Sequence, residues 1–172
     1  LPQAIDNTND IVDKIEVLKL KKDIMLPHYQ IPEGFKTQNE YLRHITNEGA
    51  RARYEILTPE SEERINFELQ TVETMGFAGY FLIVADFIRE GRKMGVLIGP
   101  GRGSAAGSAV AYCLGITSIE PLKYNLRFER FVNPDRNSMF DLDVYVELYD
   151  RQNCINYVVT TDGKNQSAQI EK

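Results

Sequence analysis

The sequence predicts a mixed α/β (α+β) fold with a helical N-terminal half, and three patterns support this prediction. Apolar residues recur at helical spacing through the first half of the 172-residue chain, as in amphipathic helices. Residues 140–144 alternate apolar and acidic side chains, which is the period of a strand. Between these regions, residues 99–108 form a glycine-rich stretch of the kind that joins a strand to a helix.

The helical elements have recognisable start and stop signals. Thr37 followed by Glu40 is a capping box, and Pro59 suits the first turn of the next helix. Glycines stand where the later helices should end. The predicted helical segments are 4–15, 37–57, 59–76 and 80–95, with an extended stretch at 20–35.

The glycine-rich stretch is a candidate phosphate-binding turn. It follows a short apolar run, 96–98, predicted to end a strand, and Ser104 is predicted to start a helix that closes at Gly115. The N–H groups at a helix start favour an anion, and Arg102 adds a charged fork for phosphate oxygens. A glycine-rich connection without any ligand is the alternative.

Asp141 and Asp143 are candidate metal ligands. On a strand, residues two apart lie roughly 6.6 Å apart along the chain, so both carboxylates leave the same face. Carboxylates in this arrangement can share or bracket Mg²⁺, which prefers oxygen ligands. The alternative is the solvent-facing side of a half-buried strand, but the phosphate turn in the same short chain favours the metal site.

Two other nucleotide-binding motifs fit the sequence less well. No Gly-Lys-Ser/Thr occurs, so a Walker motif is excluded. A dinucleotide fingerprint fits in part, because Gly101-x-Gly103-x-x-Ala106 follows the predicted strand and Glu120 lies 19 residues beyond Gly101. Its second strand would be only residues 116–119, and the two aspartates would have no role. A dinucleotide-binding oxidoreductase domain and a non-catalytic scaffold therefore remain alternatives.

Charge and composition are consistent with a nucleotide-binding domain. The net charge is −5, yet residues 89–136 carry 8 Lys/Arg against 4 Asp/Glu, a local excess of +4 around the proposed turn. Neither Cys113 nor Cys154 has metal-ligand or disulfide spacing, and Cys113 is predicted to be a core residue. No signal peptide or membrane-spanning stretch is recognised, so a cytoplasmic location and no membrane partner are expected.

A long collinear set of motifs resembles the alpha subunit of bacterial DNA polymerase III, the C-family replicative polymerases. The resemblance rests on residues 75–84, 99–108, 116–124, 128–131, 133–136 and 138–143. It implies the palm of that enzyme, with a polymerase beta-like nucleotidyltransferase fold. Residues 1–35 would be a linker after an amino-terminal phosphoesterase-like domain, and residues 36–172 the first part of the palm. Phe140 and Tyr145 depart from the family pattern, where proline and a further aspartate are usual.

The resemblance also implies a reaction and its residues. Asp141 and Asp143 would bind Mg²⁺, two ions in the complete enzyme, for transfer of deoxynucleotides to a primer 3′ end. Gly103 and Ser104 would cradle the triphosphate, with Arg102 and Arg130 offsetting its charge. The implied partners are primer–template DNA, dNTP and other replisome subunits. A third catalytic carboxylate is expected beyond residue 172, so this chain alone is not expected to extend a primer.

Overall fold

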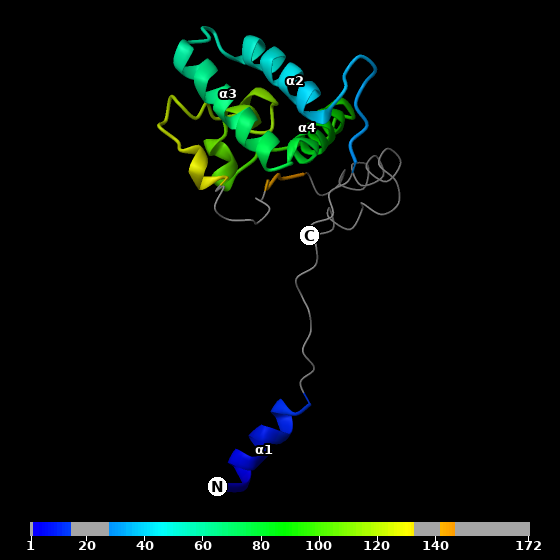
Figure 1. The fold of residues 1–172 in the computed structure, drawn as a ribbon, viewed down its shortest axis with the longest axis vertical. Helices are drawn as coiled ribbons and strands as arrows, with labels where there is room; N and C mark the ends of the chain where they lie inside the picture. The colour runs from blue at the N-terminus through cyan, green and yellow to red at the C-terminus, as the bar shows by residue number, and fades with distance from the viewer. Residues whose placement is uncertain (1, 15–27, 133–141, 147–172) are drawn as a thin grey trace.

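The computed structural model describes residues 2–14, 28–132 and 142–146, and helices dominate these segments (Figure 1). The longer helices α2, α3 and α4 form most of the body, and shorter helical turns follow them. The elements in chain order are α1 (Pro2–Val12), α2 (Gln38–Arg53), α3 (Pro59–Thr74), α4 (Ala78–Lys93), η1 (Gly103–Gly107), α5 (Ala109–Cys113) and η2 (Phe128–Arg130), the η elements being 3₁₀ helices.

The predicted helix starts are confirmed by their caps. Thr37 Oγ1 accepts the Glu40 N–H at 3.1 Å at the start of α2, and Thr58 Oγ1 accepts the Ser61 N–H at 3.2 Å at the start of α3. The helix predicted to continue to residue 57 ends at Arg53 instead. Tyr54 turns away in an extended conformation, and its hydroxyl donates to the Glu120 carboxylate at 3.0 Å. A tertiary contact therefore ends this helix earlier than its sequence pattern indicates.

The hydrophobic core lies around α4. Phe81, Leu82 and Ile88 on this helix are almost completely buried. The ring of Phe81 lies edge-on to the ring of Phe131, with centroids 6.1 Å apart. The predicted core role of Cys113 is confirmed, since its side chain is buried and packs in the same cluster.

The predicted α/β fold class is wrong for the part of the chain that the structure describes. Residues 2–14, 28–132 and 142–146 form helices, turns and two isolated antiparallel bridges, Ile98 with Val146 and Arg102 with Asp143, but no strand or sheet. A polymerase beta-like palm needs a sheet, so the predicted palm fold is wrong for these residues as well.

The residues of the turn explain why the two bridges do not extend into a continuous β-ladder. Gly99, Pro100 and Gly101 lie between the two bridges on one side, against only Val144 and Tyr145 on the other. The extra residue forces a bulge, and proline has no N–H to donate. Among the described residues, the Gly99 N–H donates to the Tyr145 carbonyl at 2.9 Å and the Arg102 N–H donates to the Asp143 carbonyl at 3.0 Å across the pair.

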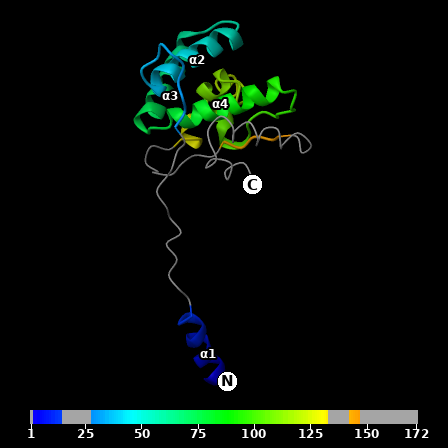
Figure 2. The ribbon, with the colours of Figure 1, turned by 90° about the vertical axis from the view of Figure 1, so that its right-hand side faces the viewer.

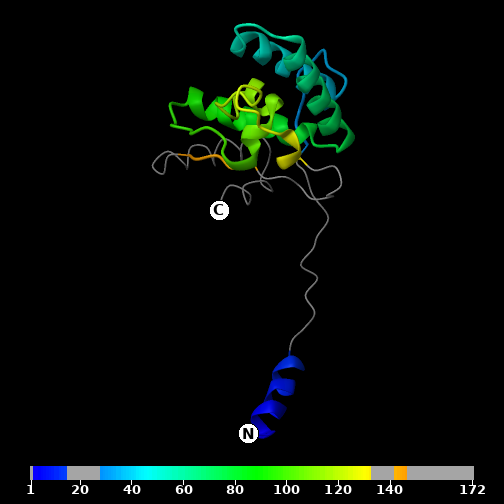
Figure 3. The same ribbon diagram turned by 90° about the vertical axis from the view of Figure 1, so that its left-hand side faces the viewer.

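Of the alternation predicted at 140–144, residues 142–144 are described and keep it, while Phe140 and Asp141 lie outside the described residues. Leu142 and Val144 pack against the core, whereas Asp143 and Tyr145 are exposed. The Leu142 N–H donates to the Tyr80 hydroxyl of α4 at 3.4 Å. Figures 2 and 3 both show this segment, in orange, on the side of α4 that faces away from α2.

In the described segments, no one helix combines the length and the apolar composition needed to cross a bilayer. Helices α3 and α4 satisfy the length and composition test only when taken together, and they are bent by 114° at the break between them. Apolar side chains from both, such as Leu69 and Phe81, are buried in the core.

Candidate nucleotide-binding site

The helix that follows the glycine-rich turn begins later than predicted. Residues 103–107 form the 3₁₀ helix η1, and α5 starts only at Ala109, with Ser108 as its N-cap in an extended conformation. The prediction that Ser104 starts the helix is therefore wrong. The predicted helix end is confirmed, because Gly115 has φ +74 and a paired set of bonds closes the helix: Gly115 N–H to Tyr112 carbonyl and Ile116 N–H to Ala111 carbonyl, both 3.0 Å.

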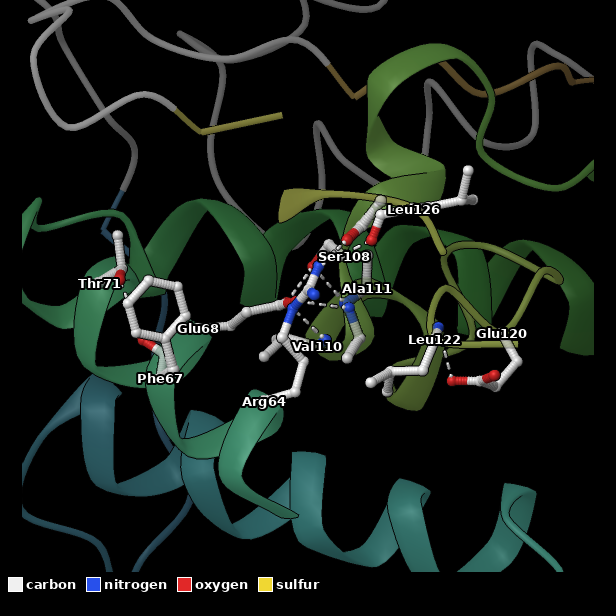
Figure 4. Close-up of polar contacts among 12 residues, drawn as sticks. Arg64, Phe67, Glu68, Thr71, Ser108, Val110, Ala111, Glu120, Leu122 and Leu126 are labelled. Atoms are coloured by element: carbon white, nitrogen blue, oxygen red, sulfur yellow. Dashed lines mark hydrogen bonds and ion pairs between the residues drawn. The ribbon is translucent and has the colours of Figure 1, made fainter. Parts of the chain in front are cut away.

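The start of α5 is occupied by a carboxylate of the protein itself. The side chain of Glu68 on α3 is completely buried and reaches this helix start (Figure 4). It accepts the N–H groups of Ala109 and Val110 at 3.0 and 3.1 Å and the Ser108 hydroxyl at 2.8 Å. The electrostatic preference of a helix start for an anion is thus satisfied internally.

Arg64 completes this buried polar cluster. Its Nε donates to Glu68 Oε1 at 2.7 Å, and the Arg64 side chain is 20% exposed. Burial raises the pKa of the Glu68 carboxyl above its usual range, although the hydrogen bonds from Ala109, Val110, Arg64 and Ser108 lower it in part. Since backbone N–H groups and a guanidinium all donate to this side chain, the geometry favours the carboxylate form.

The start of η1 has a different environment. Arg102 precedes it, and no side chain caps it. Gly103 and Ser104 are exposed, and Gly103 has φ +67, a left-handed conformation that favours glycine. A hollow of about 880 Å³ opens here, lined by Gly103, Ser104, Ala106, Gly107, Asn125, Leu126, Arg127 and Arg130. The structure thus brings predicted residues Gly103, Ser104 and Arg130 together and adds Arg127.

Arg102 and Asp143 lie next to each other beside this turn. Arg102 Nε is 3.7 Å from Asp143 Oδ2, and both side chains are more than half exposed. The Arg102 guanidinium also lies over the Tyr145 ring, with Cζ 4.7 Å from its centroid. Tyr145 thus contacts a proposed phosphate-binding arginine.

Of the two proposed metal ligands, the structure describes only Asp143, because Asp141 lies outside the described residues. Within the described segments, no three histidine, cysteine, aspartate or glutamate side chains gather as metal ligands. Asp143 offers one exposed carboxylate next to the turn. This donor fits a hard dication that takes its remaining ligands from water and phosphate oxygens.

The dinucleotide-binding alternative loses its support. Residues 116–119 form bends and irregular backbone rather than a second strand. Glu120, which would bind the ribose, accepts the N–H groups of Leu122 and Lys123 as well as the Tyr54 hydroxyl. The Glu120 carboxylate is therefore already engaged in hydrogen bonds within the protein.

Two residues of the cluster, Arg64 and Glu68, were missed from the sequence. A signal was present, because Glu68 lies three residues after Ile65 and four before Val72, on the apolar face of its helix. A carboxylate on such a face is almost never left without partners. Those partners lie about forty positions later in the chain, which the pattern could not show.

Comparison with known proteins identifies the family. The family described as "Bacterial DNA polymerase III alpha NTPase domain" matches residues 40–172. The chain belongs to this family. It is 48% identical over 171 residues to the DNA polymerase III subunit alpha of Borreliella burgdorferi, 46% over 175 residues to that of Caulobacter vibrioides, and 44% over 181 residues to that of Pseudomonas aeruginosa. Each of these matches covers 99% of this chain and 15% of the relative, so the chain spans a small part of the family's full-length proteins.

Proposed function

We propose that this chain supplies a triphosphate-binding part of the active site of a DNA-directed DNA polymerase. The observation that carries the proposal is the hollow at the start of η1, where exposed backbone and two arginines, Arg127 and Arg130, line one open space. Membership of the polymerase III alpha family supports the substrate class. The substrates in this proposal are dNTP and primer–template DNA, other replisome subunits are the partners, and the cytoplasm is the site of action.

The residues around the hollow have chemistry suited to a triphosphate. The glycine at 103 leaves the backbone unobstructed, since nothing lies within 4 Å of the position a Cβ would take. Arginine binds phosphate oxygens through two parallel hydrogen bonds and keeps its charge at any physiological pH. Arg102, Arg127 and Arg130 would thus neutralise the phosphates while Gly103 and Ser104 contact them through their backbone.

In the proposed reaction the primer 3′ hydroxyl attacks the α-phosphate, and pyrophosphate leaves. Asp143, with Asp141, would hold Mg²⁺, whose chemistry there is charge neutralisation on the phosphates and activation of the hydroxyl. Arg102 faces Asp143 at 3.7 Å, so cation-binding and phosphate-binding groups adjoin each other. The chain's own contribution is to hold the triphosphate in line for attack.

Binding can be tested on the chain itself by calorimetry with a non-hydrolysable dNTP, with and without Mg²⁺. Metal-dependent binding is expected, and the double variant Asp141→Asn with Asp143→Asn should lose it. Exposed Glu55→Gln provides the matched control. Equal binding by the double variant and the control would remove the metal assignment, and a preference for NAD over dNTP would restore the dinucleotide alternative.

Activity requires a longer protein, because this chain alone is not expected to extend a primer. A chimera in which it replaces the matching segment of the Borreliella burgdorferi relative provides that context. Asp143→Asn in the chimera should slow primer extension by about a hundredfold or more, as loss of charge stabilisation does in other active sites. Extension at the rate of the Glu55→Gln chimera would contradict the proposed function.

A further inference from the structure

We infer that Arg64 and Glu68 are positioning residues that fix the two walls of the hollow relative to each other. This inference rests on the proposed function, since the hollow is the proposed triphosphate site. One wall is η1, with Gly103, Ser104 and Gly107, and the other is the 125–130 segment. The two walls come from parts of the chain that share no helix or strand, so a tertiary contact must set their separation.

Arg64 provides a contact that joins both walls. Its Nη2 donates to the Gly107 carbonyl at 2.8 Å and to the Leu126 carbonyl at 3.2 Å. Gly107 and Leu126 both line the hollow. Figure 4 shows Arg64 and Glu68 projecting from α3 toward Ser108 and Leu126. A single guanidinium group thus links the two walls of the hollow.

Glu68 fixes that guanidinium and extends the contact to α5. It holds Arg64 Nε at 2.7 Å and also accepts from Ser108, Ala109 and Val110, which directly follow η1. Both carboxylate oxygens therefore have two donors each, which leaves the side chain little freedom to move.

The backbones of the two walls are in close contact, so a small shift of one wall relative to the other would change their packing. A Cβ at Gly107 would lie 2.6 Å from the Arg127 carbonyl oxygen, which is well inside van der Waals contact. Arg127 itself lines the hollow. If Arg64 releases the Leu126 carbonyl, the backbone that carries Arg127 and Arg130 is freed from η1. Triphosphate binding, which needs both walls at once, should then weaken.

The test uses Arg64→Lys, which keeps the charge next to Glu68 but cannot reproduce the planar fork that reaches three acceptors. Arg43→Lys is the matched control, since Arg43 donates to the exposed Asn66 side chain between α2 and α3, away from the hollow. Amide hydrogen exchange should rise about tenfold or more in peptides 103–107 and 125–130 of Arg64→Lys, because a hydrogen bond from a charged donor is lost there. Exchange in α4 should stay unchanged.

A second readout separates positioning from general stability. The affinity of the 172-residue chain for a non-hydrolysable dNTP should fall about tenfold in Arg64→Lys. In the chimera the KM for dNTP should rise more than kcat falls, because the residue acts on binding geometry. Glu68→Gln keeps the side-chain shape but replaces one acceptor oxygen with an NH2 donor, so it should loosen the same two peptides and lower the unfolding midpoint further than Arg64→Lys.

The outcomes distinguish this inference from the function it rests on. Unchanged exchange in both peptides, or dNTP affinity equal to that of Arg43→Lys, would overturn the positioning role while leaving the proposed function in place. Increased exchange in a chain whose wild type binds no dNTP would uphold the positioning role and overturn the proposed function.

Discussion

Two helix starts lie within a few residues of each other in this chain, and their surroundings are opposite. The start of α5 is buried, and Glu68 accepts from its Ala109 and Val110 N–H groups. The start of η1 at Gly103 is exposed, has no side-chain cap, and faces a hollow with two arginines. The comparison shows that the start of α5 already holds a carboxylate of the protein itself, whereas the start of η1 holds none in the described residues.

The difference also separates structural residues from candidate binding residues. Groups around the start of α5 should control folding, because burying them without partners is costly. Groups around the start of η1 should affect ligand binding and have smaller effects on stability. The expected effects on the free energy of unfolding decrease from Glu68 through Ser108 and Gly103 to Arg130.

Glu68→Ala should have the largest effect. It leaves the Ala109 and Val110 N–H groups and the partly buried Arg64 guanidinium without their shared acceptor. A loss of about 3–5 kcal/mol in the free energy of unfolding is expected, the usual cost of breaking a buried ion pair on one side. Urea unfolding followed by circular dichroism measures it. Glu63→Ala, an exposed carboxylate on the same helix, is the control, and an equal loss there would contradict the assignment.

The two serines provide a matched pair. Ser108 Oγ accepts the Ala111 N–H at 3.0 Å and donates to Glu68, so Ser108→Ala should lower the free energy of unfolding by about 1–2 kcal/mol. Ser104 is exposed, so Ser104→Ala should change it by less than about 0.5 kcal/mol. Urea midpoints of the two variants test this difference. Equal midpoints would mean that the cap is not where the structure places it.

Gly103→Ala should destabilise the chain by about 1 kcal/mol, because alanine is strained at φ +67 although no atom lies within 4 Å of the added Cβ. The same change should weaken dNTP binding by shifting the local backbone. Thermal unfolding and calorimetric titration measure the two effects. A variant with lower stability but unchanged dNTP affinity would remove Gly103 from the proposed site.

Arg130→Ala should have the smallest effect on stability, within about 0.5 kcal/mol, since its side chain is exposed. Its effect on dNTP affinity should be about tenfold at low salt and should shrink as ionic strength rises. Titrations at two salt concentrations check this. Neighbouring Glu129→Ala is the control, and an equal decrease in affinity there would argue against a direct phosphate contact.

Sequence patterns predicted the local elements well and the tertiary arrangement poorly. The caps at Thr37 and Thr58 and the helix end at Gly115 were predicted, because short-range bonds between neighbouring residues determine them. The alternation at 142–146 was real, yet it formed only bridges because the opposing turn contains a proline and an extra residue. The start of α5 was misplaced because Ser108 is its N-cap, held by Glu68 from about forty positions earlier in the chain.

The candidate site was predicted in part for the same reason. Gly103, Ser104 and Arg130 were predicted from the glycine-rich motif and the family resemblance, and the structure places them around one hollow. Arg64 was not selected, since its role depends on two carbonyls, Gly107 and Leu126, that lie 43 and 62 residues away in sequence.

The central claim is that a triphosphate meets the start of η1 and not the start of α5. Backbone amide NMR of the isotope-labelled chain, titrated with a non-hydrolysable dNTP and Mg²⁺, tests this claim directly. The account predicts that the Gly103 and Ser104 amide signals shift with the titration, while those of Ala109 and Val110, held by Glu68, stay in place. Shifts confined to Ala109 and Val110, or no shift at either helix start, would contradict it.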